Sequence, residues 1–150
     1  MNTSTRIDTS QADQLIRKHM PEYGSQPVAL TEAHGMILRE TIHAERDQPP
    51  FDRVTMDGIA IRHADLEKGR RFTVQGTQAA GMSALTLDSA GSCIEVMTGA
   101  VLPHGADTVI PVERIRREQN LAILDNDDLP AAGQFVHRQG SDHREGYGVL

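Results

Sequence analysis

The chain has 150 residues and a formal net charge of -6, with only 3% aromatic residues and one cysteine, Cys93. An acidic chain without a basic stripe is not expected to bind nucleic acid, and a single cysteine excludes an internal disulfide. Because no apolar run approaches the roughly 18 residues of a membrane span and no signal peptide opens the chain, we expect a soluble, cytoplasmic protein without membrane contact.

The first forty residues show apolar side chains at helical spacing. A first helix is predicted to start near Ser10, which together with Asp13 resembles a capping box, and to stop at Pro21, because proline cannot continue a helix. A second helix is predicted over 31–39, with Gly35 inside it at a cost of about 1 kcal/mol relative to alanine. Both apolar faces are short and need a partner to cover them.

A proline-led connector at 49–61 follows the helical part and reads PPFDRVTMDGIAI. Its double proline cannot continue a helix, and the alternating Ile59 and Ile61 predict the start of a strand. Asp52 and Asp57 lie between these two ends, mixed with apolar side chains. We interpret the connector as packed on one side and presenting acids on the other; an ordinary linker with solvated charges is the alternative.

Beyond the connector, apolar residues alternate with a period of two and are separated by glycine and proline, which is typical of a small antiparallel sandwich or barrel. The predicted fold class is therefore α+β, with a short helical N-terminal piece at 1–48 and a small β-rich, barrel- or sandwich-like domain at 49–142. Residues 143–150 are expected to return to the helical piece. The predicted strands are 71–75, 93–97, 107–112, 121–124 and 134–137.

A second stretch of interest, 95–113, contains Thr98, Gly99 and Ala100 directly after a predicted strand. A hydroxyl and free backbone amides at a strand end can hold an oxyanion or a phosphate. The segment lacks the Gly-Lys-Ser/Thr ending of a P-loop, and a plain hairpin turn is the interpretation that its chemistry alone favours.

Two other groups of polar residues do not match known metal sites. The acidic run 125–128 begins like a calcium loop, but Pro130 stands where the loop requires glycine and Val136 where it requires its closing acid, so a solvated turn is expected. The nearest cluster of potential zinc ligands lacks a standard zinc spacing and is interpreted as surface side chains: His137, Asp142 and His143.

Several separated motifs follow one another along the chain. They are Pro50-Phe51-Asp52, Met56-Asp57-Gly58, Met97-Thr98-Gly99-Ala100, Leu102-Pro103, Gly105-Ala106-Asp107-Thr108-Val109 and Glu113, followed by Arg138, Gly140 and Asp142. In this order and at this spacing they resemble the N-terminal half of molybdopterin molybdotransferases, the MoeA and gephyrin E-domain family of molybdenum insertases. The resemblance covers nearly the whole chain.

The resemblance implies a function and a set of partners. The family transfers molybdate to adenylylated molybdopterin, releases AMP and forms molybdenum cofactor, assisted by Mg²⁺. Its members are elongated homodimers with the site between two subunits, and they work with a molybdopterin adenylyltransferase. Asp57 would hold Mg²⁺ or position a water, and Thr98 with its neighbouring amides would contact molybdate or phosphate oxygens. The implied catalytic residues are Asp57, Thr98 and Asp142, and the implied cofactor-binding residues are Gly58, Gly99 and Arg138.

The chain departs from the family pattern at several positions. Residues 53–55 read Arg-Val-Thr where the family usually has Asn-Ser-Ala, and Ile59 replaces the usual tyrosine. His137 stands where an arginine is usual, with Arg138 one residue later. Because neighbouring residues of a strand point to opposite faces, a shift of one residue is not a simple substitute.

The family also continues with a doubly wound pterin-binding domain and a small C-terminal β domain, which this chain does not contain. We interpret the chain as a piece of a longer protein, the alternative being a naturally short relative, and expect it to be inactive alone. A second class of function is a non-catalytic interaction or dimerisation module with the same fold.

Overall fold

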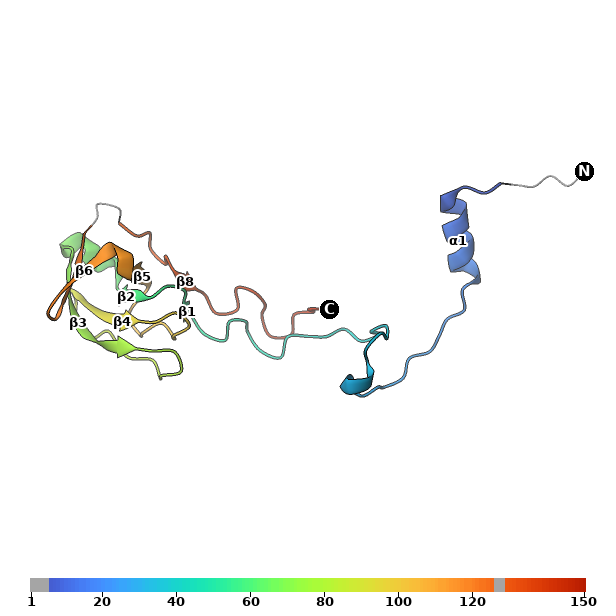
Figure 1. The fold of residues 1–150 in the computed structure, drawn as a ribbon, viewed down its shortest axis with the longest axis horizontal. Helices are drawn as coiled ribbons and strands as arrows, with labels where there is room; N and C mark the ends of the chain where they lie inside the picture. The colour runs from blue at the N-terminus through green and yellow to red at the C-terminus, as the bar shows by residue number, and fades with distance from the viewer. Residues whose placement is uncertain (1–5, 126–128) are drawn as a thin grey trace, which may run out of the picture. The chain divides into compact units, whose positions relative to one another are not determined.

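The computed structural model describes residues 6–125 and 129–150. The chain divides into two compact units, Met1–Glu40 and Thr41–Leu150, each described by itself (Figure 1). Among the described residues, no helix combines the length and the apolar composition that a membrane crossing needs.

The first unit contains helix α1 (Thr9–His19), which ends before Pro21 as predicted. Its capping box lies earlier than expected, because the carboxylate of Asp8 accepts the Gln11 amide at 2.7 Å and the Gln11 side chain accepts the Asp8 amide at 3.2 Å. The predicted box at Ser10 and Asp13 is therefore wrong. Within α1 no residue is buried, so its apolar side chains lie open.

The predicted second helix is also wrong. Only the short 3-10 helix η1 (Leu30–Glu32) forms within 31–39. Gly35 has a φ of 79°, in the left-handed region, and a right-handed helix cannot continue through that conformation. Gly35 is therefore incompatible with the helix predicted over 31–39, and η1 itself ends before it, at Glu32.

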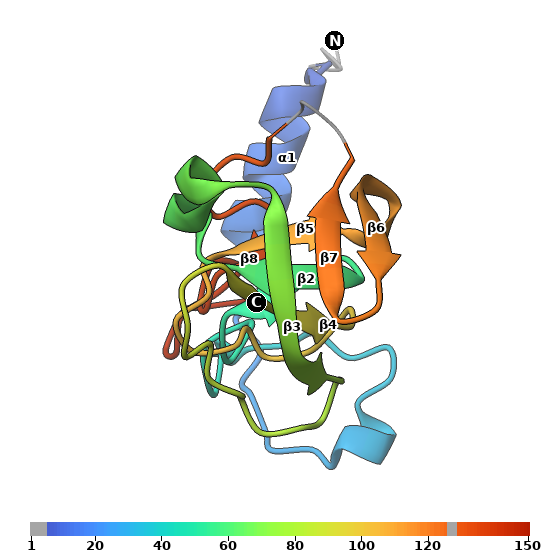
Figure 2. The same cartoon turned by 90° about the vertical axis from the view of Figure 1, so that its left-hand side faces the viewer.

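The second unit is built on a six-stranded sheet and a separate two-stranded pair. The sheet has the order β5-β2-β4-β3-β7-β6, and Figure 2 shows it curling from β6 and β7 round to β2 and β5. Its strands are β2 (Gly58–Ile61), β3 (Arg71–Gln78), β4 (Ser92–Val96), β5 (Thr108–Pro111), β6 (Ile115–Glu118) and β7 (Leu121–Leu124), with 3-10 helices η2 (His63–Lys68) and η3 (Val112–Arg114) between them. The smaller pair is β1 (Arg53–Val54) with β8 (Val136–His137).

The curled six-stranded sheet, here called the half-barrel, confirms the predicted α+β class together with helix α1. Its strand pairing differs from the purely antiparallel pairing that we expected. All neighbouring strands run antiparallel except β3 and β4, which are parallel. The five predicted strands are present, 121–124 with the predicted ends and the others with shifted ends: β3 extends to Gln78, and β8 begins only at Val136 because Phe135 has a φ of 57°. Strand β6 was not predicted.

The core occupies both faces of the central strands. Within β2, Ala60 packs into one apolar cluster and Ile59 and Ile61 into another, as successive residues of a strand must. Cys93 is fully buried in the second cluster, and burial raises the pKa of its thiol to about 12, so it is a packing residue and not a nucleophile.

The chain after β8 runs back along the residues that precede β1. The Ala44 amide donates to the Tyr147 carbonyl at 2.8 Å, and the Val149 amide donates to the Ile42 carbonyl at 2.8 Å. Nearer the sheet, the Asp142 amide donates to the Gln48 carbonyl at 2.9 Å. This irregular ribbon leads directly into the β1–β8 pair, so it fixes the loop that carries Asp142 beside the connector.

Candidate functional site

The structure brings together two predicted site residues that are 41 positions apart in the chain, Asp57 and Thr98. Asp57 directly precedes β2, and Thr98 follows β4, the strand paired with β2. The Thr98 amide donates to Asp57 Oδ1 at 2.6 Å, and the Thr98 hydroxyl donates to the same oxygen at 2.7 Å. These two hydrogen bonds hold the carboxylate in one orientation. Because both residues are exposed, the carboxylate also faces solvent.

The turn that carries Thr98 has a defined shape and a fixed place. The Ala100 amide donates to the Met97 carbonyl at 3.0 Å, which closes the turn, and Gly99 adopts a φ of 86° that favours glycine. Val54 of β1 pins the turn, because it accepts the Gly99 amide and donates to the Ala100 carbonyl, both at 2.9 Å. The backbone amides of 98–100 are thus all engaged inside the protein.

Gly58, which the resemblance assigns to cofactor binding, has a packing reason to be glycine. A Cβ atom added there would lie 1.9 Å from the carbonyl oxygen of Ile110, on the neighbouring strand β5. No side chain can occupy that space, so the glycine allows β2 to approach β5. The close approach also fixes Asp57, whose carbonyl accepts the Val112 amide at 2.9 Å.

The environment of Asp57 favours its ionised form. The Thr98 amide, and after it the Thr98 hydroxyl, lower the pKa of Asp57 below its ordinary value, because both donate to the charged carboxylate. Both donors reach Oδ1, so Oδ2 is left free of Thr98. The site presents one ionised, oriented carboxylate oxygen to solvent at neutral pH.

Arg138, also assigned to cofactor binding, is engaged with the connector. Its guanidinium donates to Asp52 Oδ2 at 2.5 Å, and the Gln139 amide donates to Asp52 Oδ1 at 2.8 Å. Burial raises the pKa of Asp52, but the Gln139 amide and Arg138 together bring it below its ordinary value. Asp52 is therefore an ionised anchor that ties the connector to the chain after β8, which sequence reasoning did not identify.

Asp142, the third predicted catalytic residue, belongs to a different set of contacts. Its Oδ1 lies 2.8 Å from Nε2 of His137, and Nδ1 of the same ring lies 3.1 Å from the Arg53 guanidinium. Arg53 and His137 face each other across the β1–β8 pair. That register depends on the fold, so in the sequence Arg53 stands out only as a departure from the family pattern and not as a partner of His137.

Asp57 is the candidate metal ligand at this site, and no cluster of other ligands accompanies it among the described residues. In the part of the chain that the structure describes, no group of three or more His, Cys, Asp or Glu side chains could hold a metal ion. Mg²⁺ does not need such a cage, because it is commonly held by one or two carboxylates together with water and substrate phosphates. Asp57 fits that mode.

The calcium-like acidic run at 125–128 is only partly described by the structure, because residues 126–128 lie outside the described residues. Its first residue, Asp125, contacts the Arg116 guanidinium at 3.2 Å.

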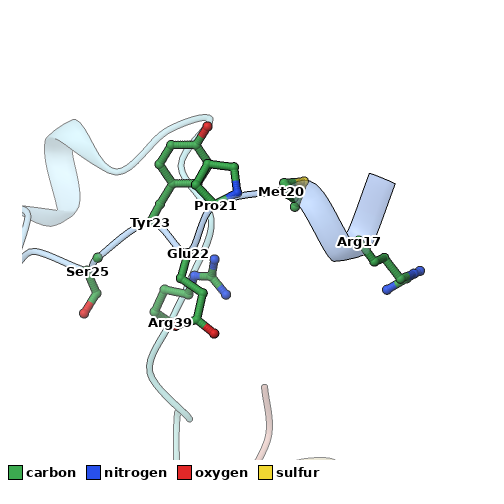
Figure 3. Close-up of a pocket in the computed structure, with 8 residues that line it drawn as sticks. Arg17, Met20, Pro21, Glu22, Tyr23, Ser25 and Arg39 are labelled. Atoms are coloured by element: carbon green, nitrogen blue, oxygen red, sulfur yellow. The ribbon is translucent and has the colours of Figure 1, made fainter. Parts of the chain in front are cut away.

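A cavity in the first unit does not coincide with this site. It follows the end of α1 and the chain beyond it, and all of its lining residues are exposed (Figure 3). An open cavity without a buried polar group is not a built binding site. The lining residues are Arg17, Met20, Pro21, Glu22, Tyr23, Gly24, Ser25 and Arg39.

The fold and the site define a recognisable class: an α+β chain whose curled mixed sheet carries a threonine-held aspartate at the start of β2. The family model described as "MoeA N-terminal region (domain I and II)" matches residues 7–150, and the chain belongs to this family.

Relatives of known name agree with this assignment. The chain is 39% identical over 145 residues to "Molybdopterin molybdenumtransferase" of Synechocystis sp., covering 96% of this chain and 37% of that protein. It is 34% identical over 150 residues to the protein of the same name from Haemophilus influenzae, covering 100% of this chain and 36% of that protein.

A solved structure gives the same result. The crystal structure of the molybdopterin biosynthesis moeA protein from Pyrococcus horikoshii OT3 superimposes with a TM-score of 0.73 at 38% identity, covering 82% of this chain and 33% of that one. The chain thus spans about a third of the length of the relatives that it matches.

Proposed function

We propose that this chain is the N-terminal part of a molybdopterin molybdotransferase, which transfers molybdate to adenylylated molybdopterin, releases AMP and forms molybdenum cofactor. The observation that carries the proposal is the ionised carboxylate of Asp57, held by two hydrogen bonds from Thr98. The relatives that match nearly the whole chain are named molybdopterin molybdenumtransferase, which supports the coarser part of the proposal, a role in molybdenum cofactor biosynthesis.

Asp57 is the residue that would hold Mg²⁺, through the oxygen that Thr98 leaves free. A bound Mg²⁺ neutralises charge on phosphate oxygens, which assists cleavage of the phosphoanhydride that releases AMP. Asp57 is suited to this role because it is exposed and stays ionised at neutral pH. Its oxygens are preorganised, so little ordering is needed when the substrate arrives.

Thr98 has a different role from the one that its position first indicated. Its hydroxyl proton and its amide are both engaged with Asp57, and the neighbouring amides of Gly99 and Ala100 are engaged with Val54 and Met97. These donors are therefore not free to bind molybdate or phosphate oxygens. We assign Thr98 to the orientation of Asp57, so the groups that bind the transferred oxyanion have to be others than those of this turn.

The partners follow from this incomplete site. A second copy of the chain in a homodimer and a pterin-binding region would complete the cleft, and a molybdopterin adenylyltransferase would supply the adenylylated substrate. Because these are small-molecule steps on soluble components, the proposed location is the cytoplasm, with no nucleic acid or membrane partner.

The proposal is tested with a chimera in which residues 1–150 replace the matching third of the Synechocystis relative. With molybdate, Mg²⁺ and adenylylated molybdopterin, the chimera is expected to release AMP, and the isolated chain is expected to release none. A chimera that folds and dimerises but does not release AMP would contradict the proposal and would support the interaction module instead.

A further inference from the structure

Three side chains of the β1–β8 pair and the loop that follows it form one continuous hydrogen-bonded series. Arg53 lies on β1 and His137 lies directly opposite on β8. The Arg53 guanidinium is 3.1 Å from Nδ1 of His137, and Nε2 of His137 is 2.8 Å from Oδ1 of Asp142. A cation and an anion are thus joined through one imidazole.

The donor and acceptor chemistry allows only one arrangement of this series. A guanidinium has donors and no acceptor, so Nδ1 of His137 has to accept from Arg53 through its lone pair. The proton of the neutral ring is then on Nε2, from which it donates to Asp142. Arg53 therefore fixes the tautomer of His137, and His137 in turn fixes one oxygen of Asp142.

Other groups in the neighbourhood cannot take over this task. Arg138 follows His137 in the chain, after β8 has ended, and its guanidinium is bonded to Asp52. The Gln139 side chain donates to Asp47 at 3.0 Å. The His137 side chain is 31% exposed and that of Asp142 is 46% exposed, so the carboxylate is held on one side and open on the other.

We propose that Arg53 and His137 are positioning residues that orient the carboxylate of Asp142 for the reaction of this site. The inference rests on the proposed function and adds Asp142 to the site of Asp57, because Arg53 adjoins Val54, whose backbone holds the turn that carries Thr98. The series also joins the connector to the loop after β8, two segments whose relative position the site depends on. Arg53 lies on β1, within the connector that carries Asp57, and Asp142 belongs to the loop after β8.

The first test is the tautomer of His137 in the isolated chain, measured from ring ¹⁵N resonances by NMR at about pH 8, where an ordinary histidine is neutral. The proposal predicts a proton on Nε2 and none on Nδ1. A ring that is protonated on Nδ1, or on both nitrogens, overturns it. This measurement does not depend on activity, so it separates failure of this inference from failure of the proposed function.

Two substitutions of His137 supply the second test. His137→Gln keeps the polarity of the series, because its amide oxygen accepts from Arg53 and its amide nitrogen donates to Asp142. His137→Leu removes both contacts. The ¹³C resonance of the Asp142 carboxylate is expected to stay near its wild-type position in the first variant and to move to that of an exposed aspartate in the second.

In the active chimera, the glutamine variant is expected to retain AMP release within about threefold, whereas the leucine variant loses about tenfold or more, the loss that one charged hydrogen bond represents. An Asp142 resonance that does not move in His137→Leu, or a glutamine variant as damaged as the leucine variant, would show that His137 does not position Asp142.

Discussion

Replacement of Gly58 by alanine is expected to destabilise the half-barrel far more than one methyl group normally does. The added Cβ would lie 1.9 Å from the Ile110 carbonyl oxygen, about 1.5 Å short of the 3.4 Å at which ordinary contact begins. Both atoms belong to backbone or are attached directly to it, so no side-chain rotation relieves the overlap. Strands β2 and β5 have to separate, and the ladder at Gly58–Pro111 and Ile59–Ile110 is disturbed.

Overpacking of a tight core costs about 1–3 kcal/mol, and an overlap between backbones belongs at or above the upper end of that range. At about 4 °C per kcal/mol, a loss of about 3 kcal/mol lowers the Tm by about 12 °C. Urea unfolding of the 150-residue chain, followed by circular dichroism, measures the change as a lower midpoint with an unchanged slope.

Gly76→Ala is the matched control, because Gly76 also lies in the sheet but its added Cβ would meet only the Leu85 side chain at 3.7 Å. Its effect is expected to stay within about 0.5 kcal/mol. Equal free energies of unfolding for the two variants would refute the argument that close approach of β2 to β5 is what requires Gly58.

Three further outcomes are expected. Thr98→Val removes the hydroxyl donor but keeps the amide, so the pKa of Asp57 should rise part of the way to its ordinary value; an unchanged NMR titration of that carboxylate would contradict the hydrogen-bond account. Burial raises the pKa of Asp65, but Lys68 and the Gly91 amide lower it overall, so its stabilisation exists above the ordinary pKa and is lost as pH falls through the folded value. Asp65→Asn should therefore cost about 2 kcal/mol in urea unfolding at pH 7 and progressively less in acid, whereas a pH-independent cost would exclude the charge as the cause. Hydrogen exchange in residues 10–40 should slow as protein concentration rises, because the open apolar face of α1 needs a partner and we expect a second copy of the chain to cover it; protection equal to that of 93–113 at every dilution would show that this unit is self-sufficient.

Short apolar runs and the glycines between them predicted most of the half-barrel. The period of two that burial on one face leaves is clear in β3, whereas β2, β4 and β5 are buried on both faces. Strand β6 leaves no such trace, since Ile115 is its only apolar residue and three charged residues follow. The parallel pairing of β3 with β4 was equally inaccessible, because alternation does not encode the direction of a neighbour. In the first unit, the left-handed backbone of Gly35 outweighed the helical spacing around it.

The residues of the candidate site also fall into two groups: those that sequence motifs identified and those that only the fold revealed. Asp57 and Thr98 were identified through family motifs, and their direct contact depends on the pairing of β2 with β4 across 41 residues. In the sequence, Arg53 is visible only as a departure from the family pattern, because its contact with His137 arises from the β1–β8 register. Residues whose role is to hold another side chain become visible only once the fold is known.

The most direct test of the account is AMP release by the chimera carrying Asp57→Asn, beside a chimera carrying Asp88→Asn at an exposed position of the same unit. Asparagine keeps the size of the side chain but removes the charge that would hold Mg²⁺. Loss of that ligand is expected to slow AMP release by about a hundredfold or more, while Asp88→Asn leaves the rate and both variants leave the Tm unchanged. Full AMP release by the folded Asp57→Asn chimera would contradict the central role given to this carboxylate.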